Sequence, residues 1–478
     1  MNASYDDFLA AKAPRAIERG LSATPSLASH LFPFQRHCVE FLLRVGSGGM
    51  FLDTGLGKTL CQAEWCEHAR CATNGYALIL TPLAVARQIE REALKFGYTA
   101  RVIRDQSEAR EGINVCNYDR LHLIDPQAYG AVSLDESSIL KSFTGKTTRA
   151  LINAFDGHRF RLSATATPAP NDHMELGQHS EFCGVMAANE MLSRFFINDT
   201  STASQQWRLK RHGVAAFWDW MASWSRMAQL PSDLGDCDDG FVMEPIRVIR
   251  HRAAESAPRM TGGLFGDEQV SATNLHEIKR GTAEKRAKIA AELVISDAEP
   301  WVIWCDTDYE ADALLAALNG IPAVAEVRGS HPAERKESTL MEFADGAVRV
   351  LITKPSVTGF GLNWQHCART AFVGVTDSWE AYYQAVRRFW RFGQRRAVDV
   401  HVFASEAEGA VIANLKRKEA DAAKLGEELA RETGEAVRAE ICGMTRTVNE
   451  YQPAVRMTVP AWLESETDGN GTTKENAA

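Results

Sequence analysis

Short, mostly apolar runs recur in two stretches of the chain, and segments with helical periodicity lie between them. The runs cover residues 76–80, 113–117, 131–134 and 160–164 in the first stretch, and residues 301–305, 323–327, 348–353, 371–375 and 398–403 in the second. Runs that are apolar on both faces suit strands buried inside a parallel sheet. Strands that alternate with helices are typical of α/β domains. The pattern predicts two α/β lobes, over residues 30–185 and 296–405.

The chain outside these lobes has a different composition. Residues 186–295 contain four of the eleven tryptophans, all within residues 207–224, followed by an acidic loop. We expect this stretch to be a mostly helical insert with a linker. Residues 406–460 begin with a stretch rich in Ala, Glu, Lys and Arg, which favours a helical C-terminal extension. Residues 1–29 form an N-terminal segment, and the polar residues 461–478 are predicted to be disordered.

The composition is typical of a soluble globular protein with more than one domain. The 478 residues are too many for one ordinary core, and 45% are hydrophobic and 24% charged. No apolar run is long enough to span a bilayer, and the first residues lack the apolar core of a secretion signal. Ten scattered cysteines favour reduced thiols and a cytoplasmic location. The net charge of −9 means that nucleic-acid binding would depend on local basic strips.

The run DTGLGKT, residues 53–59, is a candidate phosphate-binding loop. The long P-loop pattern requires a glycine at the position of Leu52 and therefore fails, whereas the shorter pattern GxGK[ST] holds. Gly55 and Gly57 let the backbone curl so that its N–H groups face phosphate oxygens. Lys58 would reach the β- and γ-phosphates of ATP, and Thr59 would hold Mg²⁺. The alternative is an ordinary turn that contains a lysine.

Asp135 and Glu136 follow an apolar run directly, in the sequence AVSLDESS. A carboxylate at the carboxyl end of a strand can hold Mg²⁺, and we assign this role to Asp135. The next carboxylate, Glu136, can orient or deprotonate the attacking water. Upstream, Gln35 follows Pro33 and could read the edge of adenine with its amide. The alternatives are an acidic loop for the pair and an exposed polar helix residue for Gln35.

Ordered motifs between about residues 30 and 405 resemble those of superfamily 2 helicases, most closely the SWI/SNF-type DNA translocases and their compact phage-encoded versions. The motifs of the first lobe are FPFQRH, LDTGLGKT, LILTPLAVARQIEREALKF, INVCNYDRL, LDESS and RLSATATPAPN. Those of the second lobe are WVIWCDTDYEADALLAAL, RGSHPAERKESTLMEF, ITKPSVTGFGLNW and YYQAVRRFWRFGQRRAVDVHVF. The resemblance implies two tandem RecA-like P-loop lobes with an ATP site between them, in a protein of the bacterial or phage-infected host cytoplasm.

The resemblance also implies roles for matched residues. Lys58, Thr59, Asp135 and Glu136 would bind and hydrolyse ATP with Mg²⁺. Arg388 and Arg391 would reach across the cleft, one of them as an arginine finger, with Arg391 also contacting the nucleotide. Ser163, Thr165 and Gln384 would couple the nucleotide site to lobe movement. Gly359, Gly361 and Asn363 would form the motif V loop, with Gly361 at the nucleotide.

One position departs from the family pattern. The family usually has Ala or Gly and then His after the Asp-Glu pair, and this chain has Ser137 and Ser138. That histidine commonly helps couple hydrolysis to lobe movement. The departure therefore concerns coupling, and it leaves magnesium binding and water activation as expected.

A translocase would track phosphates with lysines, hydroxyls and backbone amides of both lobes. Candidates are Thr81 and Lys354, each of which could equally lie in a solvated loop. Phe217, Trp220, Met221 and Trp224 share one helical face. They predict either a packed helix or a platform on which Trp220 stacks against bases, with positive charge nearby in QQWRLKRH, residues 205–212.

The sequence therefore predicts an ATP hydrolase that moves along nucleic acid, with double-stranded DNA as the expected partner. A single chain holds both lobes, so a monomer would suffice. One alternative is an ATP-driven protein remodeller whose turnover ignores nucleic acid. Others are an inactive ATP-gated clamp and a motor subunit of a nuclease or modification complex.

Overall fold

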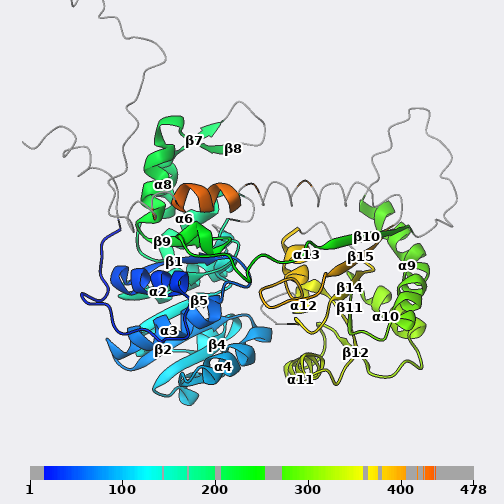
Figure 1. Cartoon of the computed structure of the whole chain (residues 1–478). Helices are drawn as coiled ribbons and strands as arrows, with labels where there is room; N and C mark the ends of the chain where they lie inside the picture. The colour runs from blue at the N-terminus through cyan, green and yellow to red at the C-terminus, as the bar shows by residue number, and fades with distance from the viewer. Residues whose placement is uncertain are drawn as a thin grey trace, which may run out of the picture. The chain divides into compact units, whose positions relative to one another are not determined.

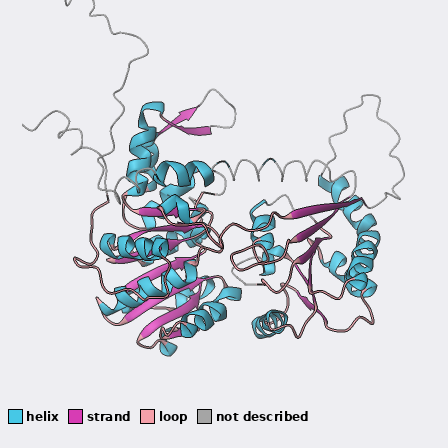
Figure 2. Cartoon of the chain, viewed as in Figure 1, coloured by secondary structure: helices cyan, strands magenta, loops and turns pink. Residues whose placement is uncertain are grey.

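The computed structural model describes residues 16–142, 145–169, 172–199, 206–252, 272–358, 364–374, 379–404, 417, 424, 426–434 and 437. Two parallel sheets, each flanked by helices, organise this part of the chain (Figures 1 and 2). This arrangement confirms the predicted α/β class with parallel sheets. No helix in the described ranges combines the length and the apolar character needed to cross a bilayer.

The first lobe is built on a seven-stranded sheet with the order β3-β4-β2-β5-β6-β1-β9. Its neighbouring strands all pair in parallel. The strands are β1 (Ser47–Leu52), β2 (Tyr76–Thr81), β3 (Ala100–Val102), β4 (Gly112–Asn117), β5 (Ala131–Asp135), β6 (Phe160–Ala164) and β9 (Ser225–Ala228). The four apolar runs predicted in this lobe are β2, β4, β5 and β6.

The sequence did not predict β1, because Ser47-Gly48-Gly49 looks like a turn. In the structure this strand lies between β6 and β9, where space is short. A Cβ atom added at Gly48 would lie only 2.3 Å from the Trp224 carbonyl oxygen. Glycine is therefore required by close backbone approach within the sheet and does not mark a turn.

Helices cover both faces of the first sheet. They are α2 (Pro33–Val45), α3 (Lys58–Cys71), α4 (Ala86–Lys95), α5 (Lys146–Ala154), α6 (Leu176–Phe182), α7 (Ala188–Phe195) and α8 (Val214–Ala222). Short 3₁₀ turns are η1 (Leu83–Val85), η2 (Gln106–Glu108), η3 (Tyr118–Leu123), η4 (Pro126–Ala128), η5 (Ser137–Lys141), η6 (His173–Glu175), η7 (Arg211–Gly213) and η8 (Pro231–Leu234). An antiparallel pair, β7 (Phe196–Asp199) and β8 (Gln206–Leu209), lies beside α8 (Figure 1).

The stretch expected as a mostly helical insert is divided between the two lobes. Strand β9 completes the first sheet beside β1, and β10 (Arg247–Arg252) pairs with β15 (Asp399–Ala404) in the second sheet. The helices expected here are present as α7, α8 and α9, but β9 and β10 were not expected, because these strands are short and lack long apolar runs. Within the described part of this stretch, β9 thus belongs to the first sheet and β10 to the second.

The tryptophan-bearing helix α8 packs inside the first lobe. Phe217, Trp220, Met221 and Trp224 are all buried, and Trp220 is 1% exposed. Trp220 contacts the rings of Phe195, Phe217 and Trp224 at centroid distances of 5.3, 5.7 and 5.6 Å. A ring enclosed in this way has no face free for a base, so the structure contradicts the stacking role considered for Trp220.

Replacing Trp220 by alanine should lower the free energy of unfolding by about 3–5 kcal/mol, because it empties a fully enclosed site. The nucleic-acid-stimulated ATP turnover that the sequence motifs imply should persist in the folded fraction. Urea denaturation and an ATPase assay would measure the two effects. Trp207→Ala, at a half-buried position on β8, should cost less stability. Loss of stimulation at unchanged stability would restore the stacking interpretation.

The second lobe contains a six-stranded sheet with the order β10-β15-β14-β11-β13-β12. Its other strands are β11 (Trp301–Trp304), β12 (Val324–Val327), β13 (Val350–Thr353) and β14 (Arg369–Phe372), and all five pairings are parallel. Its helices are α9 (Ala272–Ser296), α10 (Asp308–Ala317), α11 (Ala333–Ala344), α12 (Pro355–Thr358) and α13 (Trp379–Val386). The five apolar runs predicted here correspond to β11 to β15.

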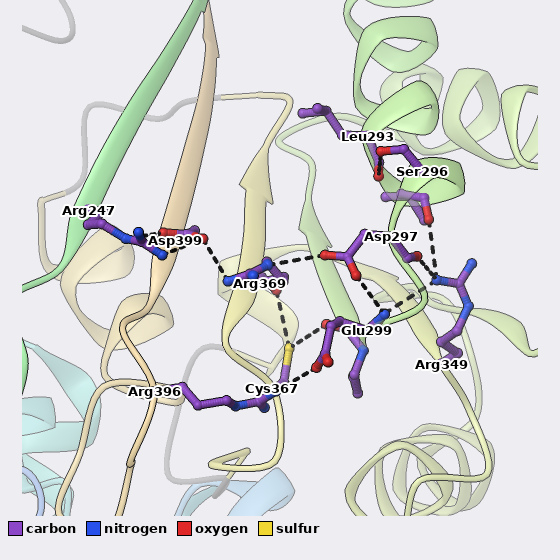
Figure 3. A network of polar contacts seen from close by, with 12 residues as sticks. Arg247, Leu293, Ser296, Asp297, Glu299, Arg349, Cys367, Arg369, Arg396 and Asp399 are labelled. Carbon is purple, nitrogen blue, oxygen red and sulfur yellow. Dashed lines mark hydrogen bonds and ion pairs between the residues drawn. The ribbon is translucent and has the colours of Figure 1, made fainter.

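A polar network joins the amino ends of strands in the second sheet (Figure 3). Asp399 accepts hydrogen bonds from Arg247 and Arg369, at 3.0 and 2.6 Å. Arg369 also donates to Asp297 at 3.1 Å, so the charges alternate from β10 to the loop before β11. The network lies at the sheet edge opposite the strand carboxyl ends, where ligands bind in open α/β sheets. It therefore supports the fold of the lobe.

Candidate functional site

A cavity of about 400 Å³ lies at the carboxyl ends of β1 and β5, and residues of both lobes line it. The first lobe contributes the candidate P-loop and the Asp-Glu pair, and the second contributes the segment after α13. The residues predicted for the nucleotide that line it are Gln35, Gly55, Gly57, Lys58, Thr59, Asp135, Glu136, Gln384, Arg388 and Arg391. Gly359, Gly361 and Asn363 lie outside the described residues.

The P-loop has the conformation that its glycines permit. Gly55 and Gly57 have φ angles of 99° and 79°, values that strain other residues. A Cβ atom at Gly57 would lie 2.3 Å from Gln35 Nε2, so a side chain there would displace the Gln35 amide. Gly57 is the N-cap of α3, whose first residue is Lys58. The loop thus directs a helix N-terminus toward the cavity, an arrangement that favours phosphate.

The Lys58 side chain lines the cavity. Its ammonium donates to the Leu52 carbonyl at 2.8 Å. Burial lowers the pKa of Lys58, and the nearby carboxylates of Glu136, Asp53 and Asp135 oppose this shift. An anionic phosphate would stabilise the charged form further. Thr59, the next residue, lines the same cavity.

A second Gly-Lys-Thr run in the chain, residues 145–147, serves as an internal comparison. Lys146 likewise begins a helix, α5, but the preceding Gly145 has an ordinary φ of −61°. Lys146 is exposed and does not line the cavity. The tripeptide alone therefore does not make a phosphate site, and the left-handed glycines before Lys58 do.

Gln35 supports the P-loop from α2. Its Nε2 donates to the Leu56 carbonyl at 2.9 Å, and its Oε1 accepts from the Phe32 N–H at 3.0 Å. Both ends of the amide are therefore bonded within the lobe. Gln35 is buried and lines the cavity, so it is not the exposed helix residue considered as its alternative. Adenine recognition by Gln35 stays a prediction.

Asp135 is oriented by two side chains that the sequence analysis did not place at the site. Gln62 Nε2 donates to Oδ1 at 2.9 Å, and Thr81 Oγ1 donates to Oδ2 at 3.0 Å. Ser133 completes the chain by donating to Gln62 Oε1 at 3.0 Å. The only signal for Gln62 is its position one helical turn after Lys58 on α3. Thr81 is fully buried, so its side chain cannot contact nucleic acid as predicted.

The donor set fits a magnesium ion held jointly with nucleotide phosphates. Burial raises the pKa of Asp135, which a cation beside the carboxylate would reverse. Each Asp135 oxygen accepts one hydrogen bond from these two side chains and keeps a further lone pair. In the described ranges, no group of three or more His, Cys, Asp or Glu residues could hold a metal by itself. Mg²⁺ is usually bound by one or two carboxylates together with water and phosphate.

Glu136 is connected to Thr165, which belongs to the run RLSATATPAPN. Glu136 has a φ of 53°, which directs the chain sharply from β5 into η5. The Thr165 hydroxyl donates to Glu136 Oε2 at 3.5 Å and accepts from the Thr167 N–H at 3.1 Å. Ser137 and Ser138, the residues that directly follow Glu136, are both buried in the first lobe. Thr165 therefore contacts the predicted base, while its coupling role stays a prediction.

Ser163 is bonded to a buried histidine, His179 of α6. The Ser163 Oγ to His179 Nδ1 distance is 2.6 Å, and His179 Nε2 lies 2.9 Å from the Pro168 carbonyl. A carbonyl only accepts, so Nε2 carries the proton and Ser163 donates to Nδ1. Burial lowers the pKa of His179 to about 4. The neutral ring therefore links Ser163 on β6 to Pro168, in the loop that follows β6.

His179 should make the stability of the first lobe depend on pH. Its pKa is about 4 when folded and 6.5 normally, so as the pH falls below 6.5 only the unfolded chain gains this proton. The free energy of unfolding should therefore fall between these values, by on the order of 3 kcal/mol in total. Urea titrations at about pH 7 and pH 5 would measure it. His179→Gln should show a smaller pH dependence, and an unchanged dependence would contradict the assignment.

The second lobe contributes two arginines to the cavity. Arg388 is 2% exposed. Burial lowers its pKa to about 9, and the nearby carboxylates of Glu136 and Asp135 oppose this shift. Burial likewise lowers the pKa of Arg391, opposed by Glu92 and Glu136. Both guanidiniums are desolvated beside the P-loop, where a polyphosphate would stabilise their charge. Gln384 is buried on α13 and lines the same wall.

Two contacts at the cavity were not predicted, because they join residues far apart in sequence. Phe392 stacks on Phe241 at a centroid distance of 4.4 Å, and Phe32 packs edge-on against both. Asp53 bonds to residues of the second lobe.

Away from the cavity, Lys354 forms an ion pair with Asp308 at 2.9 Å, and its contact with nucleic acid stays a prediction.

Comparisons with known proteins agree with this geometry. Residues 284–393 match the helicase conserved C-terminal domain. The fold is similar to that of S. cerevisiae Dbp5 bound to RNA and ADP BeF3, with a TM-score of 0.54 and 13% identity, covering 84% of this chain and 93% of that one. No curated protein matches the sequence. The chain therefore has two tandem RecA-like lobes, and the second lobe contains the match to the helicase conserved C-terminal domain.

Proposed function

We propose that the protein is a translocase that couples ATP hydrolysis between its two lobes to movement along double-stranded DNA. The observation that carries this proposal is the shared cavity. Lys58, Asp135 and Glu136 line it from the first lobe, and Arg388 and Arg391 line it from the second. Hydrolysis would then depend on the relative position of the lobes, which is what a stepping motor needs. One chain supplies both walls, so a monomer suffices.

Each residue at the cavity has a proposed role. Lys58 and the P-loop N–H groups bind the β- and γ-phosphates, and Thr59 and Asp135 hold Mg²⁺, which neutralises charge on the phosphates when bound. Glu136 orients the attacking water and accepts its proton. Arg391, with Arg388, stabilises the charge that develops on the γ-phosphoryl group. Gln384, Ser163 and Thr165 transmit the state of the nucleotide between the lobes.

The choice of track rests on the sequence motifs. The run from Gln384 to Gln394, QAVRRFWRFGQ, resembles motif VI of SWI/SNF-type DNA translocases. RNA is the second candidate, because the Dbp5 structure with the similar fold is bound to RNA. At 13% identity that likeness concerns the fold, so we weigh the motif more heavily. SWI/SNF-type relatives often move without unwinding, so strand separation is not part of the proposal.

The test is ATP hydrolysis measured without nucleic acid and with single-stranded DNA, double-stranded DNA or RNA. We expect the strongest stimulation with double-stranded DNA and its loss in Lys58→Ala and Arg391→Ala. Stimulation by RNA alone would replace the DNA track with an RNA track. Turnover that is robust but indifferent to every polymer would overturn the translocase and favour an ATP-driven protein remodeller.

A further inference from the structure

Asp53, the residue between β1 and the P-loop, is fixed at the edge of the first lobe. Its backbone N–H donates to the Ala228 carbonyl of β9 at 2.9 Å. Its Oδ1 accepts from the Thr54 N–H at 2.6 Å, which holds the first turn of the P-loop. A displacement of the Asp53 carboxylate would therefore also displace the loop that carries Lys58.

The same carboxylate is bonded to the second lobe. The Tyr383 hydroxyl donates to Oδ1 at 2.9 Å, and Arg387 Nη2 donates to Oδ2 at 2.9 Å. Tyr383 lies on α13, and Arg387 follows the helix directly, with its N–H donating to the Tyr383 carbonyl at 3.0 Å, so the two side chains face the same way. The Asp53 and Arg387 side chains are only 15% and 12% exposed. Removing one partner of such a shielded pair leaves the other charge uncompensated.

Neighbouring contacts restrict the freedom of Arg387. Its guanidinium lies 4.9 Å from the centroid of the Tyr383 ring and 4.4 Å from that of Trp390. Trp390 in turn donates to the Glu244 carbonyl at 2.6 Å. Burial and the Asp53 carboxylate raise the pKa of Tyr383, so its hydroxyl remains a donor. The Asp53–Arg387 pair is therefore shielded and contacted by neighbouring side chains, unlike a pair of exposed surface charges.

The residues that follow Arg387 are the cavity arginines. Arg388 is its direct neighbour, and Arg391 follows three residues later in the turn after α13. The P-loop also approaches the backbone just after Arg391. A Cβ atom added at Gly55 would lie only 2.7 Å from the Phe392 nitrogen. The P-loop and motif VI thus touch on both sides of the two arginines.

We propose that Asp53, Tyr383 and Arg387 form an inter-lobe latch that positions Arg388 and Arg391 over the nucleotide. The latch rests on the proposed role of these arginines in ATP hydrolysis. Asp53 is a positioning residue, since it acts through Arg387 and α13. Without the latch, Lys58 and the P-loop N–H groups would still bind ATP. The arginines would lose their alignment with the γ-phosphate, and a misplacement of about 1 Å can cost ~10²-fold in rate.

The test is a double-mutant cycle on ATP hydrolysis by the full chain without nucleic acid. Asp53→Ala and Arg387→Ala should each lower kcat by ~10²-fold, with ATP affinity changed by less than about threefold. The double variant should be no slower than the worse single variant, because either change opens the same latch. Tyr383→Phe removes one hydroxyl while preserving volume, and it should lower kcat more mildly than the alanine variants. It serves as the test if an alanine variant fails to fold.

A matched control breaks another ion pair between the lobes. Arg87 of α4 pairs with Glu337 of α11 at 3.0 Å, and both side chains are exposed. Glu337→Ala should leave kcat within about twofold, as expected for an exposed pair. Multiplicative effects of Asp53→Ala and Arg387→Ala, or an unchanged kcat in both Asp53→Ala and Tyr383→Phe, would overturn the latch. Because this assay contains no nucleic acid, it tests the latch separately from movement along a track. The latch proposal can fail while the translocase proposal stands, and the translocase proposal can fail while the latch stands.

Discussion

Replacing Arg391 by alanine should lower kcat for ATP hydrolysis by about 10³–10⁵-fold, the range found when arginine fingers are removed or supplied in other nucleotide hydrolases. The expected size follows from the site. The Arg391 guanidinium is desolvated in the cavity, where a fixed positive charge acts more strongly on the γ-phosphoryl group than in water. Nucleotide affinity should fall much less, because that charge acts mainly in the transition state. Steady-state kinetics and nucleotide titration would separate the two.

Arg395 is the matched control for this variant. It lies in the same basic strip, RRFWRFGQRR, but is exposed and does not line the cavity. Arg395→Ala should leave kcat without nucleic acid within about twofold, as is usual for exposed charges. Equal losses in the two variants would mean that the strip acts through its overall charge. Arg388→Ala then shows whether the finger is the neighbouring arginine, in which case Arg391→Ala would be the milder of the two.

Replacing Lys58 by alanine should lower kcat by ~10²–10³-fold, as when one preorganised donor to a developing charge is removed. Nucleotide binding should also weaken, because Lys58 contacts the phosphates in the ground state too. This variant therefore raises KM as well as lowering kcat, unlike Arg391→Ala. Initial rates over a range of ATP concentrations would give both parameters.

The second Gly-Lys-Thr run supplies the control for Lys58. Lys146→Ala alters the same tripeptide at another helix start, on an exposed surface. It should leave both parameters unchanged. If Lys58→Ala behaved like Lys146→Ala, the cavity would not be the nucleotide site, and the P-loop assignment would be wrong despite its geometry.

Most of the fold followed from periodicity, because strands buried on both faces have an unmistakable pattern. All nine apolar runs are strands of the two sheets. The pattern did not predict β1, β3, β9 and β10. Gly48 and Gly49 give β1 the look of a turn, and β9 has only four residues, two of them the polar Ser225 and Arg226. Such strands are defined by their neighbours in the sheet, which a local window does not contain.

The site was predictable where a motif is contiguous. Lys58, Thr59, Asp135 and Glu136 line one cavity, as their motifs suggested. Residues that act through another residue were missed or misplaced. Thr81 was assigned to nucleic acid and instead bonds Asp135, and Asp53 bonds a tyrosine 330 positions later. These contacts depend on how strands are ordered and how the lobes meet, and no local pattern encodes that.

The shared cavity has a genetic consequence. In a ring-shaped motor whose sites lie between subunits, a chain defective in its P-loop can be complemented by one defective in its arginine finger. Here a single polypeptide supplies both halves of the cavity. Co-expressed Lys58→Ala and Arg391→Ala chains should therefore stay inactive together. A truncated product that ends before α13 would keep the phosphate loop yet lack both arginines, and it would sequester ATP without turnover.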